Sequence, residues 1–497
     1  MNIKRKNTDF KFLIVVLAAV LPISLCILLI SNRFENYVLL LAALGLPAAL
    51  LTIRALFVSS IRLKLLISQL RWWHLLWFLV LLSGLVFRIR NTYEAQDSPV
   101  DFWALFRMGI MGFVGFVLLV RLAMKKTNWL HTLFQGSIGF LAAYAVVAII
   151  STLWSIYPLW TLYKSVEYLI DVVLIAAIVA SAKSINDYKL MFDWTWFLLG
   201  LLAASAWLGI LIWPDIAIRQ DVGMLGGQLA GVIPAMETNK VGELGAILGI
   251  VALNRFLFMK DSRFYLIIFL VAMATMIFAQ SRSPITGFLV ALPLMLFAAR
   301  RIGPIALTIM VMFFLLFLTG VTDVFWEYFL RGQSREEFSS LSGRTYGWVL
   351  GWELFKLNPL MGFGAYAGGR FAVLTELGTN MSSGQWSSIL NTWLEILIGV
   401  GLMGILFVIA AFIKTWANII KGTISSEAGS LFHCLAVEAI GVLALISVRS
   451  MFTTNIFWHP PLVFLLIVGY GEFMYMYYRR AKNRQRKAAY SKSLVTT

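Results

Sequence analysis

Long apolar stretches separated by short polar segments recur along the chain between residues 12 and 478. Each stretch holds roughly 20 residues, the length that a helix needs to cross the hydrocarbon core of a membrane. A helix also satisfies the backbone hydrogen bonds of such a stretch away from water. The pattern therefore predicts an all-α polytopic membrane protein with about 14 transmembrane helices, in the range 12–14. The predicted spans are 12–30, 38–53, 72–87, 102–120, 134–153, 162–182, 194–213, 241–258, 264–280, 285–299, 303–320, 389–413, 431–449 and 461–478.

Two of the polar segments are long, residues 214–240 and residues 321–388 between the eleventh and twelfth spans. A long connection in a compact protein is usually functional or unstructured. The second segment is rich in aromatic residues, which favours a folded loop over an unstructured one. Its tryptophans are Trp326, Trp348, Trp352 and Trp386. We therefore expect residues 321–388 to fold against the mouth of the helix bundle.

A helix is predicted inside this loop. Ser342 is a suitable N-cap, and Asn358-Pro359 is a typical helix end. Trp348 and Trp352, four residues apart, fall on one face of this helix. The following residues 361–364, Met-Gly-Phe-Gly, predict a flexible turn.

Composition supports a membrane protein and excludes most soluble classes. The chain is 60% hydrophobic and 13% charged, with a mean hydropathy of +0.84. Soluble domains carry about 25% charged residues. The first apolar run lacks a small-residue cleavage site, so we expect an uncleaved first span. Cys26 and Cys434 lie inside apolar spans and are expected to be packing residues.

The net charge of +17 is explained by membrane insertion. With both termini on the cytoplasmic side, 26 of the 41 lysines and arginines fall on that side, which is the positive-inside pattern. No nucleic-acid partner is needed to explain the charge. The basic tail, residues 479–497, is then cytoplasmic and suited to membrane lipids. The loop 321–388 faces outward.

Two arginines on the outer side are candidates for binding an anion. Arg282 lies in the polar break between the ninth and tenth spans, and Arg344 begins the predicted loop helix. A snorkelling side chain or a surface cation is the simpler interpretation of each. A cation at a helix N-terminus is unfavourable unless an anion binds there, and both the helix end and the guanidinium bind phosphate. The pair therefore predicts a diphosphate site.

Ionisable residues inside the spans need partners or a function. Lys164, Glu167 and Asp171 share one helical face, with Arg107 as their expected partner, and Arg255 and Glu243 form a second expected pair. Structural ion pairing is the favoured interpretation. A role in a substrate cavity stays open for Glu167 and Asp171. Of the four histidines, His459 alone is placed outside, where it is available as a base.

Several motifs together resemble the O-antigen ligase and polysaccharide polymerase family, over roughly residues 230–405. Their order, spacing and outer location carry the resemblance more than any one of them. They are Glu237-Thr238-Asn239-Lys240, Gln280-Ser281-Arg282-Ser283, Gly343-Arg344 with Trp348 and Trp352, Pro359-Leu360-Met361-Gly362-Phe363-Gly364, Asn391-Thr392-Trp393-Leu394-Glu395 and Gly401-Leu402-Met403-Gly404.

The resemblance implies a glycosyltransferase-C-like fold and a bacterial inner-membrane enzyme acting on the periplasmic or outer side. Such an enzyme moves a glycan from an undecaprenyl-diphosphate carrier to an acceptor, a glycan or lipid A–core, with no metal and no cofactor. It implies substrate-binding roles for Arg282, Arg344, Asn239, Lys240, Asn391 and Trp348, with the two arginines also catalytic. It also implies a domain order along the chain. The parts are N-terminal transmembrane helices 1–229, a catalytic region 230–405, C-terminal transmembrane helices 406–478 and the tail 479–497.

One position departs from the family pattern, because Leu390 stands where members usually carry a histidine before Asn391. Another group would then have to orient or deprotonate the acceptor. The candidates are His459, Glu395 and Glu376. His459 is slightly favoured by its pKa, which is normally near neutral.

Three other functions compete with a ligase. A polymerase that joins repeat units needs the same donor site, so the residues do not separate the two. A transporter of lipid-linked glycans would show internal repeats and broken helices at the midplane. A structural or receptor role leaves the outer arginines unexplained.

Overall fold

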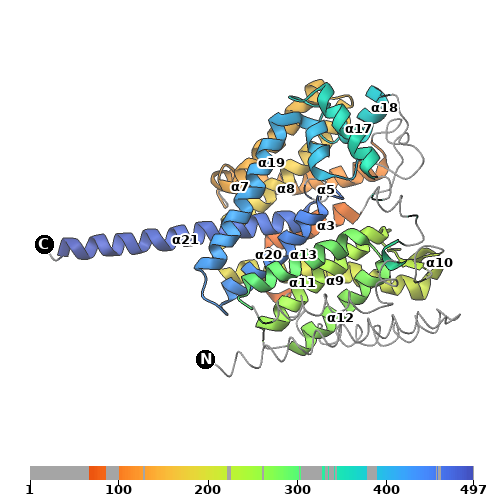
Figure 1. The fold of residues 1–497 in the computed structure, drawn as a ribbon. Helices are drawn as coiled ribbons and strands as arrows, with labels where there is room; N and C mark the ends of the chain where they lie inside the picture. The colour runs from red at the N-terminus through yellow and green to blue at the C-terminus, as the bar shows by residue number, and fades with distance from the viewer. Residues whose placement is uncertain are drawn as a thin grey trace. The chain divides into compact units, whose positions relative to one another are not determined.

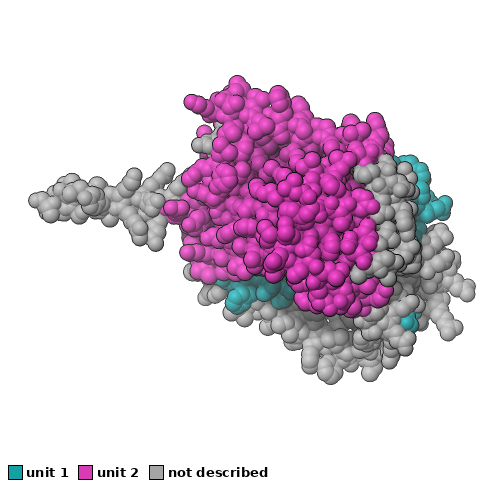
Figure 2. All heavy atoms as spheres, turned by 90° about the horizontal axis from the view of Figure 1, so that it is seen from above, with its two compact units in different colours: residues 1–70, 192–343, 428–449 teal, residues 71–191, 344–427, 450–497 magenta. Residues whose placement is uncertain are grey.

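The computed structural model describes residues 67–85, 100–126, 129–220, 225, 227–259, 262–301, 303, 327–330, 334, 341, 344–377, 389–454, 456 and 460–495. These residues are almost entirely helical (Figure 1). They belong to two compact units, each assembled from three separate segments of the chain (Figure 2). Unit 1 comprises residues 1–70, 192–343 and 428–449, and unit 2 comprises residues 71–191, 344–427 and 450–497.

Unit 1 is built around helix α11, which lies against three other helices and is buried along almost its whole length. Glycine allows α12 to approach α11 closely, because a Cβ on Gly245 would lie 2.7 Å from the carbonyl oxygen of Ala272. The elements are α9 (Ile185–Ile212, beginning in unit 2), α10 (Pro214–Ala217), β1 (Ile218–Gln220), β2 (Gly227–Leu229), α11 (Thr238–Phe258), α12 (Ser262–Ala279), α13 (Arg282–Ala298) and α20 (Leu431–Arg449). Strands β1 and β2 pair as an antiparallel hairpin.

In unit 2, helix α19 packs against α7 and α21, and helix α8 packs against α5, α7 and α21. A buried carboxylate ties three of these helices together. Glu472 of α21 accepts hydrogen bonds from Ser137 of α7 and from Asn418 of α19. The elements are α3 (Trp72–Leu85), α5 (Phe102–Ala123), α6 (Leu130–Leu133), α7 (Gly136–Ile150), the short 3₁₀ helix η1 (Ser151–Trp154), α8 (Pro158–Ser181), α17 (Arg344–Leu357), α18 (Gly368–Leu377), α19 (Thr392–Ser425) and α21 (Leu462–Val495).

The prediction of a polytopic helical membrane protein is confirmed. Six described helices are long and apolar enough to cross a membrane, α5, α7 with η1, α9, α11, α19 and α20, and three shorter apolar helices accompany them. The count of fourteen stays a prediction. The predicted spans 12–30 and 38–53, and all but the first residue of 303–320, lie outside the described residues.

Several helices run further than the apolar pattern predicted. Helix α19 ends at Ser425, beyond the predicted limit of 413, and α21 continues past 478 to Val495 (Figure 1). Apolarity marks the part of a helix that meets lipid, whereas helical hydrogen bonding continues through polar residues. The loop helix was predicted well, because α17 begins at Arg344 and ends at Leu357, just before Asn358-Pro359. Its predicted N-cap, Ser342, lies outside the described residues.

Candidate functional site

Arg282 is the first residue of α13 and follows a tight turn from α12. Gln280 in that turn has a φ of 46°, and its side chain donates a hydrogen bond of 2.6 Å to the carbonyl oxygen of Gly227 in the hairpin. Ser281 does not cap α13 with its side chain, and its hydroxyl instead donates to the side-chain oxygen of Asn239 on α11. The turn that presents Arg282 is therefore fixed by contacts with both the hairpin and α11.

The guanidinium of Arg282 is oriented by backbone oxygens. Its Nε lies 2.6 Å from the carbonyl oxygen of Phe329 and its Nη2 lies 3.0 Å from that of Leu330. Both carbonyls belong to the short helical segment 327–330 within the loop between the predicted eleventh and twelfth spans. Arg282 is half-buried there. The arginine thus joins the start of α13 to the loop instead of extending freely into solvent.

A second arginine, Arg449 at the end of α20, lies in the same network and was not singled out by the sequence. It is fully buried, with Nη1 3.0 Å from the hydroxyl of Ser283 and Nη2 3.0 Å from a carboxylate oxygen of Glu243. The same oxygen lies 3.1 Å from Nζ of the exposed Lys240. Glu243 thus lies between Lys240 and Arg449, and Arg282 is the residue before Ser283. This end of unit 1 therefore gathers three cations.

The predicted pair between Arg255 and Glu243 is wrong. Arg255 instead binds Asp193 at 2.6 Å and Glu438 at 2.9 Å. Arg255 and Glu243 are twelve residues apart on α11, which places them about 18 Å apart along the helix axis. Glu243 and Arg255 therefore lie near opposite ends of α11.

The loop arginine Arg344 belongs to unit 2 and is the first residue of α17, half-buried. Four residues later, Trp348 packs against a hydrophobic cluster formed with α18 and α19, and its ring lies 6.1 Å from that of Phe452. Trp352, predicted on the same face, is half-exposed. The α17 N-terminus thus carries a cation at the helix end that favours anions, beside a partly buried indole.

Asn391 is the N-cap of α19, and its side-chain oxygen accepts from the backbone N–H groups of Trp393 at 3.0 Å and Leu394 at 3.1 Å. The side chain of Asn391 thus has a clear role in starting the helix. Glu395, one turn later, is 3% exposed and packs so closely against Gly369 that a Cβ there would lie 2.9 Å from its Cγ. Leu390, just before the cap, has a φ of 53°.

Of the two other candidates for the base, one lies within the described residues. Glu376 is exposed on α18. His459 lies outside the described residues.

The motif residues 359–364 and 401–404 contact one another. Helix α19 is interrupted at Gly401, which has a φ of 59° and a ψ of −158°. The backbone N–H of Phe363 donates to the carbonyl oxygen of Ile398 at 2.8 Å, and that of Leu402 donates to Pro359 at 2.9 Å. The turn 361–364, which was predicted to be flexible, is therefore held in place. The break at Gly401 frees backbone groups of α19 from helical hydrogen bonds, and these groups bond to the turn and to Pro359.

Tyr366, two residues after this turn, is also buried. Burial raises the pKa of its phenol well above the ordinary value, and the neighbouring Tyr144 adds to the shift. The Tyr366 side chain therefore stays neutral at physiological pH.

A buried charged cluster in unit 2 confirms one predicted ion pair. Nε of Arg107 lies 2.7 Å from Glu167, and Nζ of Lys164 lies 3.2 Å from the other oxygen of the same carboxylate. Arg370 of α18, which the sequence did not single out, lies with its guanidinium carbon 4.8 Å from the ring centre of Trp160. Asp171, the other predicted member of this face, is 1% exposed.

The structure brings Asn239, Lys240 and Arg282 into one network of unit 1, and Trp348, Asn391 and Glu395 into contact with the α18–α19 part of unit 2. Arg282 and Arg344 belong to different units, each described by itself. Arg449 and Arg370 are the functional candidates that the sequence missed. Among the described residues, no group of three or more His, Cys, Asp and Glu side chains is placed to hold a metal ion.

Comparison with known proteins identifies one domain. The sequence model of the O-antigen ligase family matches residues 264–409, which include α12, α13, α17, α18 and the first part of α19. Arg282, Arg344 and Asn391 fall inside the match, whereas Asn239 and Arg449 fall outside it. None of the curated proteins matches the chain. The chain is therefore a multi-pass membrane protein whose residues 264–409 match the O-antigen ligase family.

Proposed function

We propose that this protein is a glycosyltransferase that moves a glycan from an undecaprenyl-diphosphate carrier to an acceptor. The acceptor is lipid A–core or another glycan, and the reaction takes place on the periplasmic or outer face of a bacterial cytoplasmic membrane. Residues 230–405 form the catalytic region, between N-terminal transmembrane helices 1–229 and C-terminal transmembrane helices 406–478. The match to the O-antigen ligase family over residues 264–409 supports this assignment.

The network around Arg282 is the observation that carries the proposal. It gathers the cations Lys240, Arg282 and Arg449 at one end of unit 1, and backbone carbonyl groups hold Arg282 at the start of a helix. Glycan transfer leaves a diphosphate whose negative charge grows as the sugar departs. Fixed donors placed at such a charge lower the barrier by about 3 kcal/mol each. Arg282 is therefore assigned to the diphosphate, with Arg344 as the second phosphate-binding arginine.

In the proposed reaction, an acceptor hydroxyl oxygen bonds to the anomeric carbon of the donor glycan. The bond between that carbon and the diphosphate oxygen breaks, and undecaprenyl diphosphate leaves. The hydroxyl proton passes to a base or to water. Because arginines neutralise the leaving group, the proposed transfer proceeds without a metal ion.

The base is the least defined part of the proposal. His459 and Glu395 are the groups proposed for it, and Asn391, Lys240, Asn239 and Trp348 are proposed to bind substrate. General base catalysis contributes about 10²–10⁴-fold, less than the stabilisation of the leaving group by two arginines. Transfer with leaving-group stabilisation alone is therefore chemically reasonable in a chain with Leu390 at the family's histidine position.

The decisive experiment supplies the purified protein, in liposomes, with a lipid-diphosphate-linked oligosaccharide and candidate acceptors. Released carrier together with a glycan on lipid A–core supports a ligase, and longer glycan on the carrier identifies a polymerase. Movement of intact donor across the bilayer without carrier release would instead indicate a transporter and refute the proposal. Activity that disappears with EDTA and returns with a divalent cation would refute the metal-independent mechanism.

A further inference from the structure

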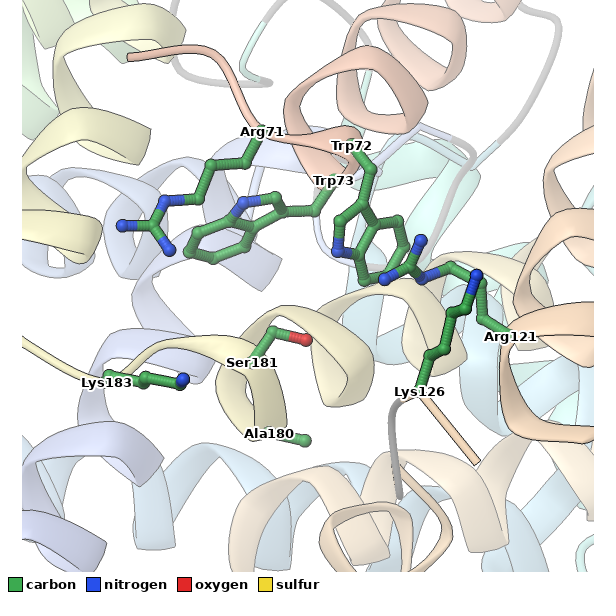
Figure 3. A pocket seen from close by; sticks show the side chains of 8 residues that line it. All are labelled: Arg71, Trp72, Trp73, Arg121, Lys126, Ala180, Ser181 and Lys183. Atoms are coloured by element: carbon green, nitrogen blue, oxygen red, sulfur yellow. The ribbon is translucent and has the colours of Figure 1, made fainter. Parts of the chain in front are cut away.

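A cavity of about 530 Å³ opens in unit 2, at the start of α3 and the ends of α5 and α8 (Figure 3). Four of its lining residues are cations, Arg71, Arg121, Lys126 and Lys183. The indoles of Trp72 and Trp73 lie between the cations, and the hydroxyl of Ser181 projects into the space below the two rings (Figure 3). None of the lining residues that the structure describes is acidic.

The positive charge of the cavity is only partly balanced. Nη2 of Arg71 lies 2.6 Å from the buried carboxylate of Asp187, which also accepts from the backbone N–H of Lys183 at 2.9 Å. Arg121, Lys126 and Lys183 form no ion pair with any residue that the structure describes. Three cations thus share a confined space without a described counter-ion.

Polar atoms in the cavity walls also lack partners. Nε of Arg121, Oγ of Ser181 and Nε1 of the fully buried Trp73 are all buried and meet no hydrogen-bond acceptor or donor among the described residues. The guanidinium carbon of Arg121 lies 3.9 Å from the centre of the Trp72 ring, which fixes its position by a cation–π contact. Buried polar groups in native proteins are normally paired. The cavity therefore has the features of a site prepared for an anion.

The neighbouring surface indicates where the anion comes from. The distribution of lysine and arginine predicts that the sequence segments 54–71, 121–133 and 183–193 are cytoplasmic. Beside the cavity, large apolar side chains are exposed on α3 and at the end of α5. They include Leu75 at 55%, Leu119 at 59% and Met124 at 55%. Basic clusters next to lipid-facing apolar surface bind the head groups of anionic lipids.

We propose that this cavity binds the phosphate group of an anionic phospholipid from the cytoplasmic leaflet. Arg121, Lys126 and Lys183 bind the phosphate, and the acyl chains lie over the exposed apolar residues of α3 and α5. Inorganic phosphate offers the same anionic group without the chains, so affinity for the lipid exceeds that for the free ion. The inference does not depend on the proposed transferase activity.

The test is a binding titration of the delipidated full-length protein, followed by native mass spectrometry. Dioleoyl-phosphatidylglycerol, dioleoyl-phosphatidylcholine and inorganic phosphate serve as the three probes. We expect phosphatidylglycerol to bind and phosphatidylcholine, with the same chains and no net charge, to bind much more weakly. A triple variant of the cavity should weaken phosphatidylglycerol binding about a hundredfold. It carries Arg121→Gln, Lys126→Gln and Lys183→Gln.

A matched control removes three cations that do not line the cavity, Arg300→Gln, Arg301→Gln and Lys421→Gln, and should bind phosphatidylglycerol as the wild type does. Equal losses in the two triple variants would reduce the effect to net charge and overturn the proposal. Inorganic phosphate binding as tightly as the lipid would overturn the lipid as the source. Should the cavity triple variant fail to fold, Lys183→Gln alone against Lys421→Gln decides by the same comparison.

Discussion

Arg282 is held at the first position of α13 by the carbonyl groups of Phe329 and Leu330. If it binds the donor diphosphate, Arg282→Ala removes a fixed donor from the charge that develops in the transition state. We expect glycan transfer to fall about 10²–10³-fold. Arg282→Lys should recover little of it, because an ammonium lacks the fork geometry of guanidinium. The initial rate of carrier release from reconstituted protein measures both effects.

Arg301→Ala is the control for Arg282, since it removes an arginine just past the other end of the same helix. It should leave transfer unchanged. Arg344→Ala is expected to behave as Arg282→Ala does, with an unaltered elution profile in detergent. Near-normal transfer by both alanine variants would refute the assignment of these arginines to the diphosphate.

Arg449 and Glu243 form a buried pair whose energetic coupling is measurable. Arg449 is 0% exposed and lies 3.0 Å from the carboxylate. Removing one partner of a buried pair leaves an uncompensated charge and costs about 3–5 kcal/mol. Arg449→Met and Glu243→Gln should each lower the stability in detergent by that amount, measured by denaturant unfolding. The double variant should lose much less than the sum, and strictly additive losses would show that the pair is not coupled.

Four variants test which group acts as the base. Leu390 is included because it stands at the position of a histidine in the family pattern. We expect His459→Ala to reduce transfer more than Glu395→Gln or Glu376→Gln, and Leu390→His to increase it, by up to about 10²-fold. The pH dependence of the rate adds a second readout, because a histidine base requires its neutral form. Three silent losses and no gain would mean that leaving-group stabilisation suffices and that neither His459 nor Glu395 acts as a base.

The partner of a side chain was predictable where a single helix or an apolar environment leaves few possible partners. The Arg107–Glu167 pair was predictable, because charged side chains inside membrane-spanning helices need partners of opposite charge. The partner of Arg255 was missed, because Glu438 and Asp193 reach it from helices whose packing the sequence does not reveal. Arg370 was missed for the same reason, since only the fold places it over Trp160.

At the scale of elements, the break in α19 joins the motifs 359–364 and 401–404, which are separate segments in the sequence. Gly401 has a φ of 59°, and a Cβ there would lie 2.3 Å from the carbonyl oxygen of Leu360. Gly401→Ala should therefore destabilise the protein by at least about 1–3 kcal/mol from backbone strain alone. It should also release the turn 359–364, measured as faster hydrogen exchange at Phe363 and Leu402.

The control for Gly401 is Gly347→Ala in α17, where a Cβ would meet nothing within 4 Å. Alanine is favoured over glycine in a helix interior by up to about 1 kcal/mol, so this variant should be neutral or more stable. Unchanged stability and exchange in Gly401→Ala would show that the turn does not depend on the break in α19.

The apolar pattern located these elements but not their ends or their contacts. Helix α17 was predicted almost to the residue, because a proline follows it. The kink in α19 was not, since Gly401 stands in an otherwise apolar run where glycine is tolerated in membrane helices. The turn at 361–364 was predicted as flexible because its glycines allow many conformations. Its hydrogen bonds to α19 and Ile156 select one of them.

At the scale of the whole molecule, each unit combines segments that lie far apart in the chain. The end of α20 brings Arg449 to Glu243 and Ser283, across more than 160 residues of sequence. Hydrophobic periodicity describes each span separately and carries no information about which spans pack together. The resemblance to a family predicted a catalytic region at residues 230–405, whereas the network around Arg282 became visible only in the fold.

Sidedness is the property of the whole molecule on which the proposed function depends most. The lysine and arginine distribution predicts that α17 and the loop around it face outward, while Lys421 near the end of α19 faces the cytoplasm. Ser339→Cys, outside the described residues, and Glu353→Cys, whose side chain is 50% exposed, report on the loop. Each is introduced after Cys26→Ala and Cys434→Ala. Both should react with an impermeant thiol reagent in outer-permeabilised cells, whereas Lys421→Cys should react only after lysis of the inner membrane. The reverse pattern would place Arg344 on the cytoplasmic side, where transfer from an outward-facing donor cannot occur.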